Sequence, residues 1–473
     1  VPGSGSVQFG PDGTRALITA KETSAGTTTT RIAMFNAATG NQIGTTLVLN
    51  GDGSVEYGPD ATRVLITTDV YDSGTASHTT QVTMFNTTTG TRTGTLSLIG
   101  SPYALDPVFS PDGTRALITT TVYDPAATLH TSRVTMLNTA TAGQIGTTFT
   151  FTGPEVARTT WSADGTRALI TTIPTQYNSV PSPALVAVID TAGSQVGTTH
   201  TLPGMPDYGD GPVWSPDGTR VLIRTVVVNV ATGINTTQVT TINTTTGTQT
   251  GTPVTLTSSA FGGRTVWIPN GNRAMITAGD KVAVINATTG SQTGSTVTIN
   301  GIPSAPVFSA DGSRALIATQ TDVTVIDTTT GTRIGTTFTL TSPRPIVILL
   351  TADGTHALVT TDRRGIGTAA VPTTPVAVID LTTGTQIGST LNLIGDTYAS
   401  PAFTLNGTRA LIATSADNPT NGISTTRVTT IDTATGSPTG ATLTLSGALA
   451  SGVGNPLRVV LSPDGTRALV ATI

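Results

Sequence analysis

The chain has 473 residues, of which 11% are charged, and its formal net charge is −4. This balance argues against a nucleic-acid-binding surface, which needs clustered lysine and arginine. The absence of cysteine excludes disulfides, thiolate metal sites and cysteine nucleophiles. No apolar run reaches about 18 residues, so we expect no membrane-spanning segment.

One segment recurs ten times along the chain, and its clearest copy is "FSPDGTRALITT" at residues 109–120. Each copy carries an Asp or Asn in its turn, here called the anchor. The anchors are Asp12, Asp60, Asp112, Asp164, Asp217, Asn270, Asp311, Asp353, Asn406 and Asp464. A segment that recurs at such nearly regular intervals predicts a repeat fold, in which each copy forms one structural unit of the same domain.

The third unit shows how one repeat is organised. We predict strand a at 108–110, strand b at 115–120, strand c at 133–138 and strand d at 145–151. The a–b turn is "PDG", in which Pro presets φ, Asp bonds the backbone ahead of it and Gly takes positive φ. The c–d turn is "NTTTG" or "DTTTG" in other units, with an Asx start and a Gly finish.

Hydrophobicity differs between the strands of a unit. Strand b is a continuous apolar run such as "ALI", as expected where both faces are covered. Strand d alternates, as in "TTFTFTG", so one of its faces meets solvent. We predict an all-β β-propeller of about nine four-stranded antiparallel blades, with nine full repeats plus one extra a–b hairpin. Since no linker of shifted composition divides the chain, residues 1–473 are predicted to form one large propeller.

The pattern "SPDGTRALITT…VTVIDTTTGTRIGTT" resembles the YVTN/YncE-like β-propeller repeat, a relative of WD40-like and TolB-like propellers. The resemblance covers almost the whole chain, although "ALIT" or "ALIA" replaces the Tyr-Val-Thr-Asn stretch. It implies a propeller fold. It implies little about function, because propellers serve binding, scaffolding and catalysis alike.

Two kinds of residue recur around the anchor and are expected to be structural. A large side chain lies three residues before it, as Phe9, Tyr57, Phe109, Trp161, Trp214, Trp267, Phe308, Leu350, Phe403 and Leu461. We expect these side chains to pack between blades. An arginine lies three residues after every anchor except Asp353, where His356 replaces it. We expect the arginines to cap turns or join adjacent blades; a ring of phosphate-binding arginines is the functional alternative.

The variable b–c and d–a connections should emerge together on one face of a propeller. Loops on a rigid scaffold commonly carry the residues that bind ligands. Tyrosines and acidic residues gather there, and His78 and His130 each lie 18 residues after an anchor. The candidate binding residues are Tyr71, Asp72, His78, Tyr103, Asp106, Tyr123, Asp124, His130, Tyr177, Tyr208 and Asp210. The alternative to a binding role is that the tyrosine rings only pack against their own loops, that the two histidines were inherited by duplication of a repeat, and that the acidic residues are simply solvated.

No catalytic residue, metal site or cofactor is predicted, because no nucleophile elbow or phosphate-binding loop is present. The favoured interpretation is a non-enzymatic binding module with a protein or glycan ligand at the loop-rich face. The Thr-rich, Lys-poor composition is typical of secreted or cell-surface proteins. The alternatives are a structural protein that assembles into a layer or fibre, and a propeller enzyme acting on a glycan.

The last a–b hairpin ends at Ile473 without strands c and d. The chain can be a portion of a longer protein, or the hairpin can close a nine-bladed ring. Alternatively, a second chain completes the blade, because an unpaired sheet edge invites strand pairing. Self-association through the terminal hairpin is therefore a further expectation.

Overall fold

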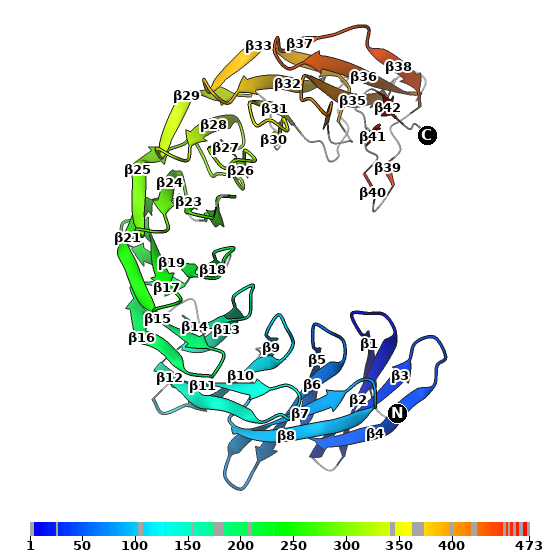
Figure 1. Cartoon of the computed structure of the whole chain (residues 1–473), viewed down its shortest axis with the longest axis vertical. Coiled ribbons are helices and arrows are strands. Elements are labelled where there is room, and N and C mark those ends of the chain that lie inside the picture. The colour runs from blue at the N-terminus through cyan, green and yellow to red at the C-terminus, as the bar shows by residue number, and fades with distance from the viewer. Residues whose placement is uncertain are drawn as a thin grey trace. The chain divides into compact units, whose positions relative to one another are not determined.

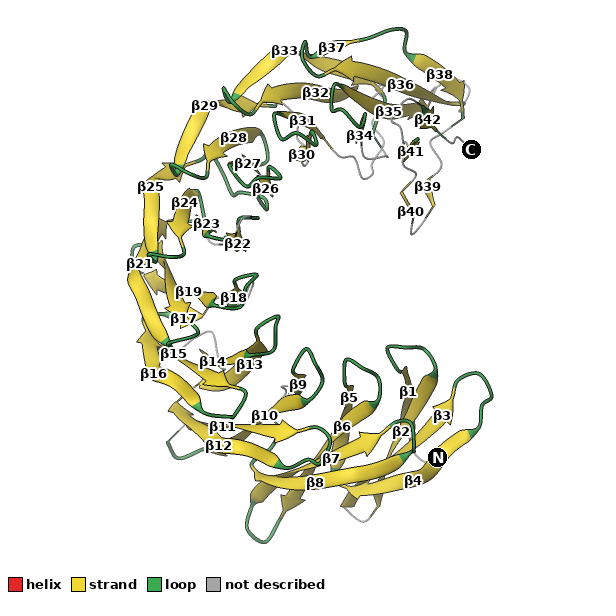
Figure 2. Cartoon of the chain, viewed as in Figure 1, coloured by secondary structure: helices red, strands yellow, loops and turns green. Residues whose placement is uncertain are grey.

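The structure is a computed structural model, and every regular element that it describes is a β-strand (Figure 1, Figure 2). It describes residues 4–24, 27–102, 107–127, 129–153, 155–174, 183–206, 211–229, 231–260, 262–269, 271–340, 346–361, 373–397, 401–417, 423–447, 451–452, 455–456, 460–462 and 467–470. The anchors Asn270 and Asp464 lie outside these residues.

The chain divides into two compact units, residues 1–228 with 238–250 and residues 229–237 with 251–473. Blades 1 to 4 belong to the first unit. Blade 1 is β1 (Ser4–Phe9), β2 (Arg15–Ser24), β3 (Thr27–Asn36) and β4 (Gln42–Asn50); blade 2 is β5 (Asp52–Tyr57), β6 (Arg63–Asp72), β7 (Ser77–Asn86) and β8 (Thr91–Ile99). Blade 3 is β9 (Val108–Phe109), β10 (Arg115–Asp124), β11 (Leu129–Asn138) and β12 (Gln144–Gly153); blade 4 is β13 (Glu155–Trp161), β14 (Arg167–Pro174), β15 (Ala184–Asp190) and β16 (Gln195–Leu202).

The division between the units falls inside blade 5, and blades 6 to 9 belong to the second unit. Blade 5 is β17 (Met205–Pro206), β18 (Val213–Trp214), β19 (Arg220–Asn229), β20 (Ile234–Asn243) and β21 (Thr248–Ser258); blade 6 is β22 (Thr265–Trp267), β23 (Arg273–Ala278), β24 (Lys281–Asn286) and β25 (Ser291–Thr298). Blade 7 is β26 (Val307–Phe308), β27 (Arg314–Ala318), β28 (Asp322–Asp327) and β29 (Thr332–Thr339); blade 8 is β30 (Ile346–Leu350), β31 (His356–Thr361), β32 (Thr373–Asp380) and β33 (Thr385–Ile394). Blade 9 is β34 (Ala402–Phe403), β35 (Arg409–Asp417), β36 (Ser424–Asp432), β37 (Ser437–Pro438) and β38 (Leu443–Ser446).

Each blade is an antiparallel sheet in the order a-b-c-d, so the predicted fold class, a β-propeller of nine four-stranded blades, is confirmed. In blade 5 strand a is split into β17 and β18, which both pair with β19. In blade 9 strand d is split into β37 and β38, which both pair with β36. The structure therefore bears out the propeller-repeat resemblance, while the narrower YVTN assignment and the single domain over 1–473 stay predictions.

Two short hairpins follow blade 9. They are β39 (Ser451–Gly452) with β40 (Asn455–Pro456), and β41 (Val460–Leu461) with β42 (Ala468–Leu469). The second is the predicted extra a–b hairpin, in which the Ser462 amide donates to the Arg467 carbonyl at 2.8 Å. Val470, directly after β42, packs against the core cluster of blade 9 that contains Ala413.

Strand b of blade 3 is covered on both faces by neighbouring blades. In blade 3, Ile118 packs with Leu65 of blade 2, whereas the adjacent Leu117 packs with Ile170 of blade 4. Because successive side chains of a strand point to opposite faces, a strand between two sheets must be apolar at every position. This arrangement explains the "ALI" runs and confirms the interpretation given to them.

The large side chains before the anchors pack between blades, as predicted. Trp161 of blade 4 is 9% exposed, lies among residues of blades 3 and 4, and donates from Nε1 to the Val108 carbonyl of blade 3 at 3.0 Å. Tyr57 of blade 2 packs on Met34 of blade 1, and burial raises the pKa of Tyr57 to about 12. Phe9 of blade 1 is an exception, since it is 62% exposed.

The arginines after the anchors join neighbouring blades. Arg115 of blade 3 donates from Nε to the Thr191 carbonyl in the c–d turn of blade 4 at 3.0 Å, and its Nη1 lies 3.8 Å from Asp112. The same link is made by Arg167 to the Thr244 carbonyl and by Arg314 to the Leu381 carbonyl. Because these guanidinium groups already bond carbonyl groups of the next blade, the arginines are better explained as links between blades than as a ring of phosphate-binding sites.

Each anchor carboxylate organises its own turn. The Asp311 carboxylate accepts from the Ser309 hydroxyl at 2.7 Å and from the Ser313 amide at 2.9 Å. The Ser309 hydrogen bond, followed by the bonds to Ser313, lowers the pKa of Asp311 to about 2. Hydrogen bonds to a carboxylate favour its charged form.

This geometry predicts that the stability contributed by the Asp311 turn depends on pH. Since the folded pKa of Asp311 lies below the ordinary aspartate value of 3.8, the stabilisation by its carboxylate is complete above that value and is lost as pH falls toward 2. We expect Asp311→Asn to lower the free energy of unfolding at pH 7 by at most about 1 kcal/mol, because solvent screens this exposed group. Urea unfolding at pH 7 and at pH 2 measures the difference, which should shrink at the lower pH.

Asparagine is a matched replacement because the repeat already uses it. In blade 9, Asn406 Oδ1 accepts from the Thr404 hydroxyl at 2.9 Å and from the Thr408 amide at 3.2 Å. A stability difference between Asp311→Asn and the native chain that is the same at both pH values would contradict the proposed role of the carboxylate charge.

Candidate functional site

The predicted b–c loops of blades 2 and 3 are in fact mostly strand. Strand b of blade 3 was predicted to end at 120 and strand c to begin at 133, but β10 runs to Asp124 and β11 starts at Leu129. Tyr123 pairs with His130 in this extended ladder, and Tyr71 pairs with His78 in blade 2. The prediction that these residues lie in loops is therefore wrong. The Val, Thr and Tyr residues here favour extended backbone, so the ladder continues through them.

The extension of blade 2 carries an aromatic pair near its tip. The Tyr71 and His78 ring centroids are 4.8 Å apart with an interplanar angle of 44°. Tyr71 is 57% exposed, so the tilted ring pair presents apolar ring surface and polar atoms to solvent together. Cross-strand aromatic neighbours on one face of a ladder support one another in this way.

Blade 3 repeats the pair. The Tyr123 and His130 centroids are 4.7 Å apart with an interplanar angle of 35°, and Tyr123 is 52% exposed. Together, Tyr71 with His78 and Tyr123 with His130 are called the Tyr–His pairs below. Sequence reasoning identified all four residues, but it did not predict that they stack in pairs.

The two pairs differ in what lies beside the histidine. In blade 2, His78 Nδ1 donates to the Asp69 carboxylate, with Nδ1–Oδ2 and Nδ1–Oδ1 distances of 2.9 Å and 3.0 Å. The Ser101 hydroxyl donates to Asp69 Oδ2 at 3.0 Å. In blade 3, Thr121 takes the place of Asp69, nine residues after its anchor, and burial lowers the pKa of His130. Burial thus favours the neutral form of the His130 imidazole in blade 3.

Asp69 and Ser101 were not among the predicted site residues. One signal was available, because the segments "TTDVYD" and "TTTVYD" differ only at the position of Asp69. A carboxylate two residues before Tyr71 on the same strand must share its face. Ser101 gave no such signal, since the connection after β8 brings it to Asp69 only in space.

Asp72 and Asp124 cap the tight turns that close these hairpins. Asp72 Oδ1 accepts from the Gly74 amide at 2.9 Å and Oδ2 from the Thr75 hydroxyl at 2.8 Å, and the Thr75 bond is the main cause of its lowered pKa. Asp124 Oδ1 accepts from the Ala126 amide at 2.9 Å. Both carboxylates hold the turns that present the Tyr–His pairs; a direct part in binding stays a prediction.

The other predicted site residues, Tyr103, Asp106, Tyr177, Tyr208 and Asp210, lie outside the described residues. Within the described part, no three His, Asp or Glu side chains gather closely enough to hold a metal ion. The same part of the chain contains no helix that is both long and apolar enough to cross a membrane.

No protein family and no curated protein matches the chain. Among solved structures it is similar to a eukaryotic initiation factor, with 14% identity, 88% of this chain and 94% of that chain covered, and a TM-score of 0.38. It is also similar to the C-terminal WD40 domain of Sif2 (12%, 69% and 80%, TM-score 0.30) and to the periplasmic gluconolactonase PpgL of Pseudomonas aeruginosa (18%, 67% and 91%, TM-score 0.29). Likenesses at this level carry no information on function.

Proposed function

We propose that the chain is a non-enzymatic binding module, secreted or on a cell surface, that takes a glycan or protein ligand at the blade ends carrying the b–c connections. The observation that carries the proposal is the Tyr–His pair, presented twice and half exposed on adjacent blades. Tyrosine is enriched at recognition surfaces because it combines a large rigid area with a hydroxyl group.

The chemistry of the pairs favours a glycan as the ligand. An exposed tyrosine ring offers a flat apolar face to sugar C–H groups, and the tyrosine hydroxyl and imidazole nitrogens can bond sugar hydroxyls. The Asp69 carboxylate is already engaged by His78 and Ser101, which supports a positioning role for it rather than acid catalysis. The enzyme alternative would require a further acid to converge on the same ligand.

The proposal predicts that Tyr71→Ala combined with Tyr123→Ala weakens glycan binding at least tenfold. A central aromatic residue commonly contributes about 2 kcal/mol to binding, and 1.4 kcal/mol corresponds to tenfold in Kd. A glycan screen on the full chain first identifies the ligand, and calorimetry then compares the variants. Thr329→Ala is the control, because Thr329 is exposed in the c–d turn of blade 7, at the opposite end of its blade. Undiminished binding by the double variant would reject the Tyr–His pairs as the site.

Assembly is the second candidate, and one observation favours it. Val7 and Phe9 of β1 are 60% and 62% exposed, although the residues equivalent to Phe9 are buried in blades 2 and 4. An exposed apolar sheet face of this kind suits association with another sheet. A strictly monomeric mass at high concentration would exclude assembly and leave the binding proposal intact.

A further inference from the structure

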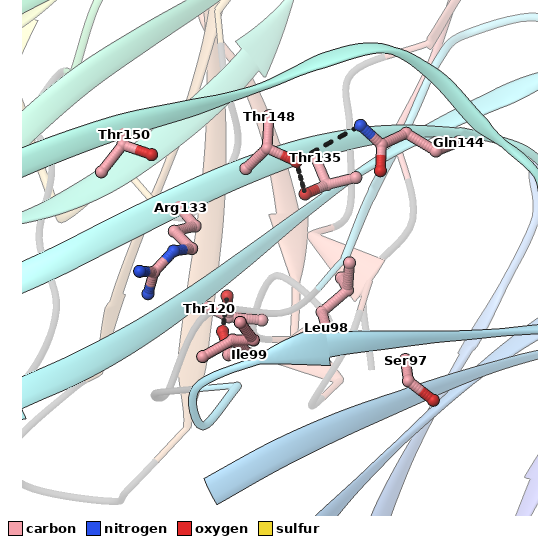
Figure 3. A pocket seen from close by; sticks show the side chains of 9 residues that line it. All are labelled: Ser97, Leu98, Ile99, Thr120, Arg133, Thr135, Gln144, Thr148 and Thr150. Carbon is pink, nitrogen blue, oxygen red and sulfur yellow. Dashed lines mark hydrogen bonds between the residues drawn. The ribbon is translucent and has the colours of Figure 1, made fainter.

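A cleft of about 290 Å³ separates the outer strand of blade 2 from blade 3 (Figure 3). The end of β8 forms one wall with Ile99, and β10, β11 and β12 contribute Thr120, Arg133 and Thr150. In the figure, the Arg133 guanidinium extends from β11 on the side where Thr120 and Ile99 lie. The cleft is separate from the Tyr–His pairs, none of whose residues lines it.

Arg133 is the single ionisable residue of the nine that line the cleft. Its Nη1 is shielded from solvent and has no hydrogen-bond partner within the structure as described. A buried donor without a partner is costly, and the cost is larger when the donor is charged. The Arg133 donor therefore lacks a hydrogen-bond acceptor, which a ligand in the cleft could supply.

Blade 1 shows what an arginine at this position binds. Arg31 and Arg133 both lie five residues before the Asn that opens the c–d turn. Arg31 Nη2 lies 3.3 Å from Glu22 Oε2, so the acceptor in blade 1 is a carboxylate of the same sheet. Glu22 pairs with Thr29 in the ladder, two residues before Arg31.

In blade 3 this carboxylate is missing. Val122 pairs with Thr131, two residues before Arg133, and therefore holds the place that Glu22 has in blade 1. The two hairpins share the ladder register and the arginine but differ in the acid. The Arg31 guanidinium therefore has a carboxylate partner on its own sheet, whereas the described residues of blade 3 offer Arg133 no such partner, and Arg133 lies beside an open cleft.

We propose that the cleft binds the carboxylate of a small polyhydroxylated acid, such as a sugar acid, through Arg133. A guanidinium matches a carboxylate with two parallel N–H donors. The remaining lining supplies hydroxyl and amide groups: Thr150 lies opposite Arg133 in the ladder, and Gln144 donates to the Thr148 hydroxyl at 3.4 Å. These groups suit a ligand that carries several hydroxyls, and the volume suits a single monosaccharide-sized molecule.

Calorimetry on the full chain with glucuronate, glucose and acetate tests the proposal. We expect glucuronate to bind at least tenfold more tightly than either glucose or acetate. Arg133→Gln should weaken glucuronate binding at least tenfold. Gln81 already occupies the equivalent position of blade 2, opposite Thr68 as Arg133 is opposite Thr120, so the sheet accepts this replacement.

A second variant separates loss of the ligand from loss of the fold. Val122→Glu restores the blade 1 arrangement, in which a carboxylate of the same sheet pairs with the arginine. The new carboxylate should compete with glucuronate for Arg133 and weaken glucuronate binding at least tenfold. The melting temperature of this variant should be equal to or higher than that of the native chain. Unchanged glucuronate affinity in either variant overturns the proposal, as does equal affinity for glucose or acetate. Thr329→Ala, in the exposed c–d turn of blade 7, should leave glucuronate binding unchanged. Because none of the Tyr–His residues lines the cleft, this proposal and the function proposed above fail independently.

Discussion

Replacement of Trp161 by alanine is expected to lower the free energy of unfolding by about 3–5 kcal/mol, the range found when a buried tryptophan is truncated. Trp161 is 9% exposed and fills the space between blades 3 and 4, so alanine leaves a cavity that both sheets line. It also removes the Nε1 donor of the Val108 carbonyl, worth about 1 kcal/mol. Urea unfolding of the two proteins measures the loss, with far-UV circular dichroism as the signal because tryptophan fluorescence would differ between them.

The repeat supplies two controls for this experiment. Phe9 holds the same place in blade 1 but is 62% exposed, so Phe9→Ala should change the free energy of unfolding by less than about 0.5 kcal/mol. Trp161→Phe keeps most of the apolar area, as in blade 3, where Phe109 holds this place, and should cost mainly the hydrogen bond. Equal losses for Phe9→Ala and Trp161→Ala would contradict packing between blades as the role of this position.

The blades could be predicted because each is specified locally. The "PDG" turn, the apolar run of strand b and the Asx–Gly turn of c and d each fix a short segment by its own chemistry. Leu117 and Ile118 are covered from two sides, and that requirement is visible as an uninterrupted apolar run. Repetition then reinforced these signals, because the a–b hairpin occurs ten times and the c–d hairpin nine times.

The candidate site was less predictable because it depends on which side chains meet. The polar, Thr-rich segments around Tyr71 and Tyr123 suggested loops, whereas continued cross-strand pairing made them strands. The contact of His78 with Asp69 depends on the ladder register, and the unsatisfied Nη1 of Arg133 depends on the lack of an acid at the position of Val122. Neither follows from residue type alone, and the cleft beside Arg133 exists only once two blades are packed together.

Replacement of Gly90 by alanine is expected to lower the free energy of unfolding by about 2–5 kcal/mol, from two separate causes. Gly90 ends the c–d turn of blade 2 with φ of 67°, where an L-residue other than glycine loses about 1–2 kcal/mol. An added Cβ would also overlap the Ile43 carbonyl and the backbone of Gly44 in blade 1. Overpacking of this kind typically costs about 1–3 kcal/mol. Urea unfolding measures the total.

Gly40 isolates the first cause, because it is the same turn residue in blade 1 but has free space around it. Its φ is 69°, but a Cβ there meets no atom within 4 Å. Gly40→Ala should therefore lose only the conformational term of about 1–2 kcal/mol, and the difference between the two variants gives the cost of separating two neighbouring blades. Close backbone contact then explains why glycine recurs at both Gly44 and Gly90: the outer strands of adjacent blades touch through main chain, with no room for a side chain between them. An equal loss in the two variants would mean that the blades move apart without cost, and the outer contact would then contribute nothing to holding them together.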